Sequence, residues 1–102
     1  MSTVDLTLKN FDEVTGSGLV LVDFWAGWCM PCRMVAPVIE QLAKDYEGRV
    51  IIGKVDTDQE RQLAERFEIM SIPTVILFEN GREVKRIIGV QQKRIYESAL
   101  DS

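Results

Sequence analysis

The chain has 102 residues, 46% hydrophobic and 27% charged, which predicts a single domain over residues 1–102 with a core of its own. Its net charge of −4, with scattered basic residues, argues against binding to nucleic acid or to an acidic membrane surface. No segment approaches the roughly 18 apolar residues of a membrane span, and the first residues do not form a signal peptide, so we expect a cytoplasmic protein.

The first quarter of the chain predicts a strand, a short helix and a second strand. Residues 4–8 alternate apolar and polar side chains, as in a strand with one buried face. A short helix over 10–14 ends at the glycine-rich breaker 16–18. Residues 19–25 are almost continuously apolar, which is typical of a central strand covered on both faces, and Asp23 interrupts this run.

A long amphipathic helix is expected next, beginning at the pair of cysteines. Its apolar stripe is formed by Val35, Val38, Ile39, Leu42, Ala43 and Tyr46. Pro37 lies inside the helix and predicts a kink, and Gly48 ends it. Residues 50–55 form a second buried strand. Thr57 and Glu60 then fit a capping box at the start of another helix.

The remainder predicts a hairpin and a final helix. Residues 74–78 form a strand, Asn80-Gly81 is a strong signal for a type I′ turn, and 83–88 form the returning strand. A helix over 91–100 closes the chain. Strands joined through helices pair in parallel by right-handed crossovers, and the hairpin adds an antiparallel edge. The expected fold is therefore a mixed sheet with helices on both faces.

Both cysteines of the chain stand in the stretch Trp28-Cys29-Met30-Pro31-Cys32, between the central strand and the long helix. Two thiols at this spacing on the first turn of a helix can form a disulfide with each other or attack another disulfide. A structural zinc site needs about four ligands, and the chain has no histidine and no third cysteine. The pattern therefore predicts redox chemistry without a metal.

The position of the two cysteines predicts unequal roles. A thiolate is the attacking species, and the free amides and dipole of a helix N-terminus stabilise an anion. We expect Cys29, at the helix edge, to be exposed and to attack, and Cys32, one turn inward, to be buried and to resolve the mixed disulfide. Burial should raise the pKa of Asp23, a candidate acceptor for the Cys32 proton, with Lys54 modulating it.

Several other interpretations stay open at this stage. The cysteines could form a metal site between two subunits, or could be inert buried residues. Asp23 could be a structural residue bonded to the backbone, and Pro73 an ordinary trans proline at the start of a strand. We expect Trp25 to lie in the core and Trp28 to serve at the surface beside the motif.

Further segments accompany the cysteine pair along the whole chain. They are Val22-Asp23-Phe24-Trp25-Ala26, Ala36-Pro37, Lys54-Val55-Asp56, Ile72-Pro73-Thr74, Phe78-Glu79-Asn80-Gly81 and Gly89. In order and spacing, these segments and the cysteine motif resemble the thioredoxin family. The resemblance implies an α/β thioredoxin fold, with a central five-stranded mixed sheet in the order 3-1-2-4-5 flanked by four helices.

The resemblance also implies a function and a set of site residues. It implies a monomeric protein-disulfide reductase that binds no cofactor and receives electrons from a separate thioredoxin reductase, linked to NADPH or to ferredoxin. By position, Cys29 is the nucleophile, Cys32 the resolving thiol and Asp23 the proton acceptor assisted by Lys54. The implied substrate groove is formed by Trp28, Met30, Pro31, Ile72, Pro73, Gly89 and Val90, with Pro73 in the place of the family's cis-proline.

One residue inside the motif departs from the family pattern. Thioredoxins typically carry glycine where this chain has Met30, and the residues between the cysteines affect the redox potential. The motif alone therefore leaves an oxidant or isomerase open beside the reductase. A non-catalytic subunit that presents the groove to a partner protein is a further alternative. A glutathione-dependent reductase fits less well, because the whole-chain pattern is the longer thioredoxin one.

Overall fold

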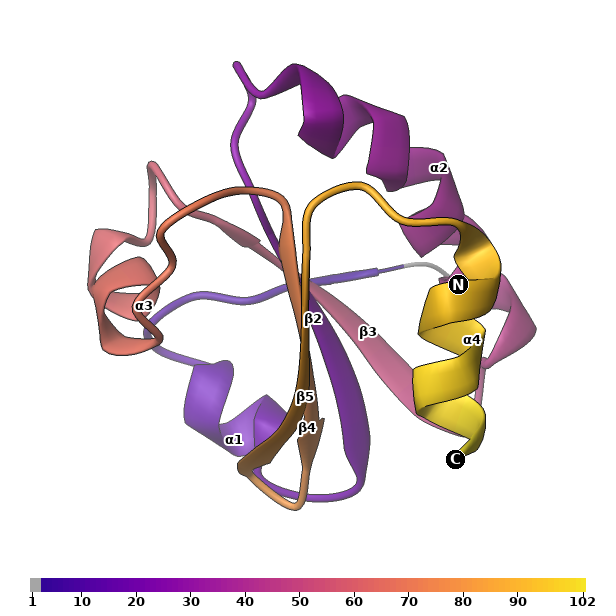
Figure 1. Ribbon diagram of the computed structural model, residues 1–102. Helices are drawn as coiled ribbons and strands as arrows, with labels where there is room; N and C mark the ends of the chain where they lie inside the picture. The colour runs from indigo at the N-terminus through magenta and orange to yellow at the C-terminus, as the bar shows by residue number, and fades with distance from the viewer. Residues whose placement is uncertain (1–2) are drawn as a thin grey trace.

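The computed structural model describes residues 3–102 and shows one five-stranded sheet with helices on both faces (Figure 1). The strands are β1 (Val4–Asp5), β2 (Leu19–Trp25), β3 (Val50–Asp56), β4 (Thr74–Glu79) and β5 (Arg82–Ile88). The helices are α1 (Phe11–Thr15), α2 (Met30–Asp45), α3 (Arg61–Arg66) and α4 (Lys93–Asp101). The predicted α/β class and the order of the elements are confirmed. Among the residues described, no helix is long and apolar enough to cross a membrane.

The strands lie in the order β1-β3-β2-β4-β5, which corrects the predicted order 3-1-2-4-5. β2 pairs in parallel with β3 and antiparallel with β4, while β1 pairs with the outer side of β3. Gly53 provides the physical reason why β1 lies beside β3. The Leu6 side chain lies over β3, where its Cδ1 atom is 2.5 Å from the place that a Cβ at Gly53 would take. A residue without a side chain thus leaves room for the N-terminal segment beside β3.

This contact predicts a loss of stability in Gly53→Ala. The added Cβ has to displace the buried side chain of Leu6, and overpacking of this kind costs about 1–3 kcal/mol. Urea unfolding measures the difference from wild type. Gly27→Ala is the matched control, since no atom lies within 4 Å of a Cβ at Gly27. Equal stability of the two variants would show that Leu6 moves aside without cost.

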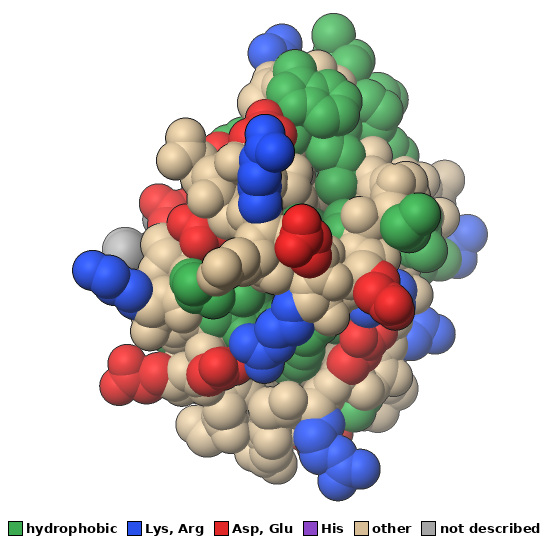
Figure 2. All heavy atoms as spheres, turned by 90° about the vertical axis from the view of Figure 1, so that its left-hand side faces the viewer, with side chains coloured by type: hydrophobic (Ala, Val, Ile, Leu, Met, Phe, Trp, Pro, Cys, Tyr) green, Lys and Arg blue, Asp and Glu red, His purple; other side chains and the backbone are tan. Residues whose placement is uncertain are grey.

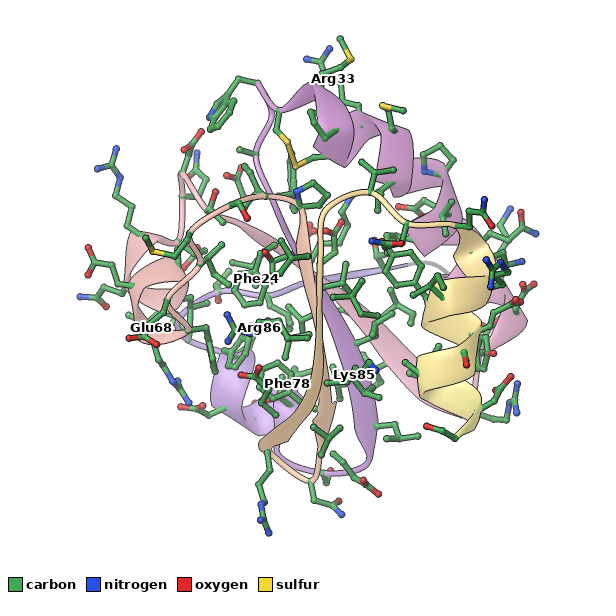
Figure 3. All side chains as sticks on the ribbon, viewed as in Figure 1. Phe24, Arg33, Glu68, Phe78, Lys85 and Arg86 are labelled. Atoms are coloured by element: carbon green, nitrogen blue, oxygen red, sulfur yellow. A yellow bond between two sulfur atoms is a disulfide. The ribbon has the colours of Figure 1, made fainter. Side chains whose placement is uncertain are left out.

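The hydrophobic core lies on both faces of the sheet, as the apolar run in β2 predicts. Val22 and Phe24 pack in a cluster beneath α1 and α3, whereas Leu21 packs on the other face with residues of α2 and α4. Figure 3 shows Phe24 and Phe78 on the side of the sheet that α1 and α3 cover. Since side chains alternate along a strand, Asp23 points to the face of Leu21, toward α2 and α4.

The hairpin between β4 and β5 turns at Asn80 and Gly81, as predicted. Both residues have positive φ, 52° for Asn80 and 85° for Gly81, as a type I′ turn requires. The side-chain oxygen of Asn80 also accepts a hydrogen bond from the Gly18 amide at 2.9 Å. This bond fixes the tip of the hairpin to the loop that precedes β2.

The predicted capping box before α3 is wrong. Glu60 is the N-cap residue, but no side chain caps the helix. The Thr57 hydroxyl donates instead to the carbonyl oxygen of Trp25 at 3.1 Å, and the Glu60 carboxylate accepts from the Leu8 amide at 3.0 Å. Both side chains thus bond to residues far away in sequence. These two bonds tie the start of α3 to the end of β2 and to the N-terminal segment.

Candidate active site

The two cysteines lie where the sequence places them, at the N-terminus of α2, and they form a disulfide with 5.3 Å between their Cα atoms. Cys29 is the N-cap residue in an extended conformation, and its Sγ accepts a hydrogen bond from the Cys32 amide at 3.1 Å. Pro31 lies in the first turn, where a missing amide leaves no helical bond unmade. Local chemistry therefore brings both sulfur atoms to one helix end.

The helix end favours a negative charge on Cys29 more than on Cys32. The Cys29 sulfur faces a free amide of the first turn, and the dipoles of a 16-residue helix align behind it. The first turn contains no acidic residue that would offset this field. After reduction of the disulfide, Cys29 is thus the sulfur that the fold stabilises as a thiolate.

The predicted difference in burial between the cysteines is wrong for the disulfide form. Both residues are 3% exposed, and they form a small cluster with Ala26 against which Trp25 and Ile72 pack. The cover comes from the end of β2 and from the loop before β4, which local sequence around the motif does not specify. The two cysteines therefore differ in their position along α2 and not in their exposure to solvent.

The loop before β4 lies against the disulfide. The carbonyl oxygen of Ile72 is 3.8 Å from the Sγ atom of Cys29, and the Ile72–Pro73 peptide bond is cis. The Gly89 amide donates to the Pro73 carbonyl at 2.9 Å, which joins the end of β5 to this loop, and Val90 next to it is exposed. The structure thus brings together groove residues that lie forty or more positions from the cysteines in sequence.

Trp28 and Met30 form the exposed apolar rim of the motif. Both side chains are largely in solvent, and the Trp28 indole N–H donates to the Asp58 carboxylate at 2.9 Å. The predicted surface position of Trp28 is confirmed, whereas Trp25 is half-buried and packs on the disulfide rather than lying in the core.

Two more methionines extend this rim and were not predicted. Met34 on α2 is exposed, and Met70 is 92% exposed in the loop before Pro73. Met70 lines a pocket of about 190 Å³ together with Trp28 and Ile72. Hydrophobic side chains gather at the end of the molecule where α2 begins, at the top of Figure 2. The sequence does contain a signal that could have identified Met34 as a surface residue, because Met34 lies outside the apolar stripe of its helix.

Asp23 lies in the core with one carboxylate oxygen unpaired. It is 1% exposed, and burial raises its pKa from 3.8 to about 6, an effect that the positive charge of Lys54 reduces. Lys54 is the residue opposite Asp23 in the parallel pairing of β2 and β3. Among residues 3–102, no group donates a hydrogen bond to the Oδ1 atom of Asp23. The carboxyl group therefore titrates close to neutral pH, as a proton acceptor requires.

A cavity lies beside Cys32 and Lys54. Its volume is about 120 Å³, and Trp25, Cys32, Arg33 and Lys54 are among its lining residues. Arg33, labelled in Figure 3, donates to the Gly27 carbonyl at 2.9 Å and borders the cavity at the start of α2. Lys54, which lies opposite Asp23 in the sheet, therefore borders the same cavity as Cys32, whereas Asp23 itself does not line it.

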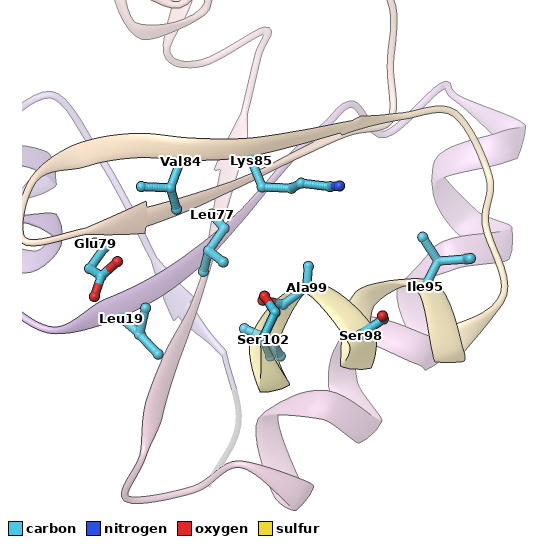
Figure 4. Close-up of a pocket in the computed structure, with 10 residues that line it drawn as sticks. Leu19, Leu77, Glu79, Val84, Lys85, Ile95, Ser98, Ala99 and Ser102 are labelled. Atoms are coloured by element: carbon cyan, nitrogen blue, oxygen red, sulfur yellow. The ribbon is translucent and has the colours of Figure 1, made fainter.

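A further pocket, shown in Figure 4, lies at the other end of the sheet. Its volume is about 500 Å³, and its lining includes Leu19 at the start of β2, Lys85 on β5 and Ser102 after α4. Neither cysteine contributes to it, so it is separate from the redox site. Within the described part of the chain, no three His, Cys, Asp or Glu side chains are grouped so that they could hold a metal ion.

Comparisons with known proteins agree with this geometry. A family model described as Thioredoxin matches residues 2–102. A thioredoxin of Staphylococcus haemolyticus (strain JCSC1435) is 50% identical over 101 residues, which are 99% of this chain and 97% of that protein. Thioredoxins of Staphylococcus aureus strains, among them Mu50 and MW2, are 48% identical with the same coverage.

Proposed function

The chain belongs to the thioredoxin family and is a thiol–disulfide oxidoreductase, and we propose that it reduces disulfides of other proteins through unequal roles of Cys29 and Cys32. The observation that carries this proposal is the disulfide at the N-terminus of α2, with Cys29 as the N-cap residue and Cys32 one turn inward. The helix field activates one sulfur, and the other stays within reach to resolve the product of the first attack.

In the first step, the Cys29 thiolate attacks one sulfur of the substrate disulfide. A bond forms between Cys29 and that sulfur, the substrate S–S bond breaks, and the second substrate sulfur leaves as a thiolate that takes up a proton. The free amides of α2 support this step because they stabilise the attacking thiolate of Cys29.

In the second step, Cys32 gives its proton to the carboxylate of Asp23 and attacks the Cys29 sulfur. The Cys29–Cys32 bond forms, the bond from Cys29 to the substrate breaks, and the substrate leaves as a second thiolate. Two electrons have then passed from the dithiol to the substrate disulfide, and the product is the disulfide of the structure. The pKa of about 6 at Asp23 supports its part, since the carboxylate is ionised at neutral pH yet basic enough to accept.

The proposed substrate site is the exposed backbone and apolar surface beside Cys29. The Ile72 carbonyl is close to the sulfur, and Trp28, Met70 and Ile72 border a pocket next to it. An extended substrate segment would pair with backbone here, and such pairing reads little sequence, which suits many disulfide-containing proteins. Trp28, Met30, Pro31, Ile72, Pro73, Gly89 and Val90 are the residues proposed for this site.

We further propose the setting in which the protein works. Its electrons come from a separate thioredoxin reductase, and it binds no cofactor itself; the sequence supports this because it has no nucleotide- or flavin-binding motif. It acts as a monomer in the cytoplasm, where a reducing environment suits a dithiol that donates electrons.

The test is reduction of insulin disulfides driven by NADPH and a thioredoxin reductase, together with the equilibrium potential against a glutathione buffer. We expect turnover in the wild type and none in Cys29→Ser. A wild-type potential close to that of strong oxidants, combined with no insulin reduction, would contradict the reductase and support an oxidant or isomerase. Partner binding that survives replacement of both cysteines by serine would support a binding subunit.

Met30→Gly is expected to change the redox potential and the rate with the reductase. Met30 is the first residue of α2 and lies between the cysteines with its side chain exposed. Glycine gives the open dithiol more conformational freedom than the closed ring, an effect of about 0.4–1 kcal/mol. This difference between the two redox forms corresponds to a shift of about 10–20 mV toward less negative potential. The reductase rate should fall, because an apolar contact is lost.

Equilibration with a glutathione buffer measures the potential of this variant. Met34→Gly is the control, because Met34 is exposed on the same helix but lies outside the ring that the disulfide closes. Equal potentials and equal reductase rates for wild type and Met30→Gly would show that Met30 has no part in redox behaviour.

A further inference from the structure

Two buried side-chain oxygens in residues 3–102 have no protein hydrogen-bond partner, and they belong to Asp23 and Tyr96. Buried polar atoms are nearly always paired in native proteins, so each exception calls for a physical reason. The mechanism above uses Asp23 and leaves Tyr96 without a role.

The two groups lie on the same side of the sheet. Asp23 points from β2 toward α2 and α4, and Tyr96 extends from α4 into the cluster that fills this space. The cluster also contains Val75, the residue opposite Asp23 in the pairing of β2 and β4. Burial and, to a smaller extent, the negative charge of Asp23 raise the pKa of the Tyr96 phenol, and the backbone of Gln91 reduces this rise.

In the oxidised protein, where Cys32 is in the disulfide and has no thiol proton, the other neighbours of Asp23 do not supply a neutral donor. β3 places Lys54 opposite it, β4 places the apolar Val75, and α2 places Cys32 on the cavity that Lys54 also lines. Tyr96 is the group that α4 contributes, and its raised pKa keeps it protonated at neutral pH. A protonated phenol beside a carboxylate acts as a hydrogen-bond donor.

On the basis of the reductase function above, we propose that the Tyr96 hydroxyl is a positioning group that donates to the ionised carboxylate of Asp23 and holds it ready for the proton of Cys32. The bond is made directly after a side-chain rotation or through one bridging water. Donation to the ionised form favours that form, so Tyr96 opposes the effect of burial on Asp23. The hydroxyl touches no reacting atom and acts through Asp23 alone.

Tyr96→Phe tests this proposal, because it removes one oxygen and keeps the packing of the ring. The midpoint of the Asp23 titration, followed by the carboxyl ¹³C resonance in the oxidised protein, should rise by about one pH unit. The pH profile for resolution of the mixed disulfide should move in the same direction. Tyr46→Phe is the matched control: its hydroxyl donates to Asp101 at 3.0 Å, and the Asp23 midpoint should not change.

An unchanged or lower Asp23 midpoint in Tyr96→Phe would overturn the proposal. If that variant does not fold, the phenol titration of Tyr96 in Asp23→Asn provides the reciprocal measurement. The Tyr96 midpoint should fall there, and an unchanged value would equally overturn the proposal. The carboxyl titration does not depend on turnover, so a wild-type protein that fails to reduce insulin would contradict the proposed function and leave this test intact.

Discussion

Cys32→Ser is expected to stop catalytic turnover and to leave the substrate attached to Cys29 as a stable mixed disulfide. Cys29 keeps its place at the N-terminus of α2 in this variant, so the first attack continues. The second attack is lost, because a serine hydroxyl does not displace a sulfur from a disulfide. Turnover should fall by about three orders of magnitude or more, since a dilute external thiol lacks the advantage of an attacking group held in the same molecule.

The mixed disulfide is measured by intact mass under non-reducing conditions, with release of the substrate on addition of excess dithiol. Cys29→Ser is the matched control and should form no adduct, because Cys32 lies one turn inside the helix. Both cysteines are equally buried in the disulfide form, so exposure does not decide between them. Adducts in Cys29→Ser but not in Cys32→Ser would reverse the two roles.

Features governed by local chemistry could be predicted from the sequence. The bounds of β2 follow from an apolar run that only Asp23 interrupts, and the turn at Asn80 and Gly81 follows from two residues that accept positive φ. The placement of Cys29 at the N-cap follows from the spacing of the cysteines and from Pro31. In each case the cause lies within a few residues of the effect.

Features that depend on distant partners could not be predicted in this way. The position of β1 depends on Leu6 resting over Gly53, a contact between segments far apart in the chain. The capping box fails because Thr57 bonds to Trp25 at the end of β2. The equal burial of the cysteines depends on Ile72, which a separate loop brings against them.

The residues of the candidate site also divide into those that the sequence could predict and those that it could not. Its cysteines and Asp23 stand out in sequence because thiols at this spacing and a carboxylate in an apolar strand each carry a chemical signal. Tyr96 carries no such signal, since an aromatic residue on the inner face of an amphipathic helix is ordinary core. Its hydroxyl gains meaning only when the fold places it on the same face as Asp23.

Asp23→Asn is expected to stabilise the protein above neutral pH while slowing resolution of the mixed disulfide. The folded-state pKa of about 6 lies above the value of 3.8 for a solvated carboxyl, so the native state binds more protons between these values. Wild-type stability therefore falls as pH rises from about 4 to about 6, by about 3 kcal/mol in all, and then levels. An asparagine does not titrate, so the variant should lack this fall.

Urea unfolding at about pH 4 and about pH 8 measures the stability, and Asp12→Asn is the control of opposite sign. A hydrogen bond from Arg66 lowers the pKa of Asp12, so that carboxylate stabilises the protein at neutral pH and the stabilisation is lost as pH falls. Asp12→Asn should therefore be the less stable variant above pH 4, while its rate of resolution stays at the wild-type value.

The rate and the stability together decide what Asp23 is for. A proton acceptor for Cys32 contributes to resolution, so Asp23→Asn should slow that step at neutral pH by about one to two orders of magnitude, at or below the lower end for a general base. A purely structural carboxylate would show the opposite pair of results, a loss of stability with an unchanged rate across neutral pH. A buried charge with an unpaired oxygen lowers stability, and a part in the reaction would account for the presence of such a charge at this position.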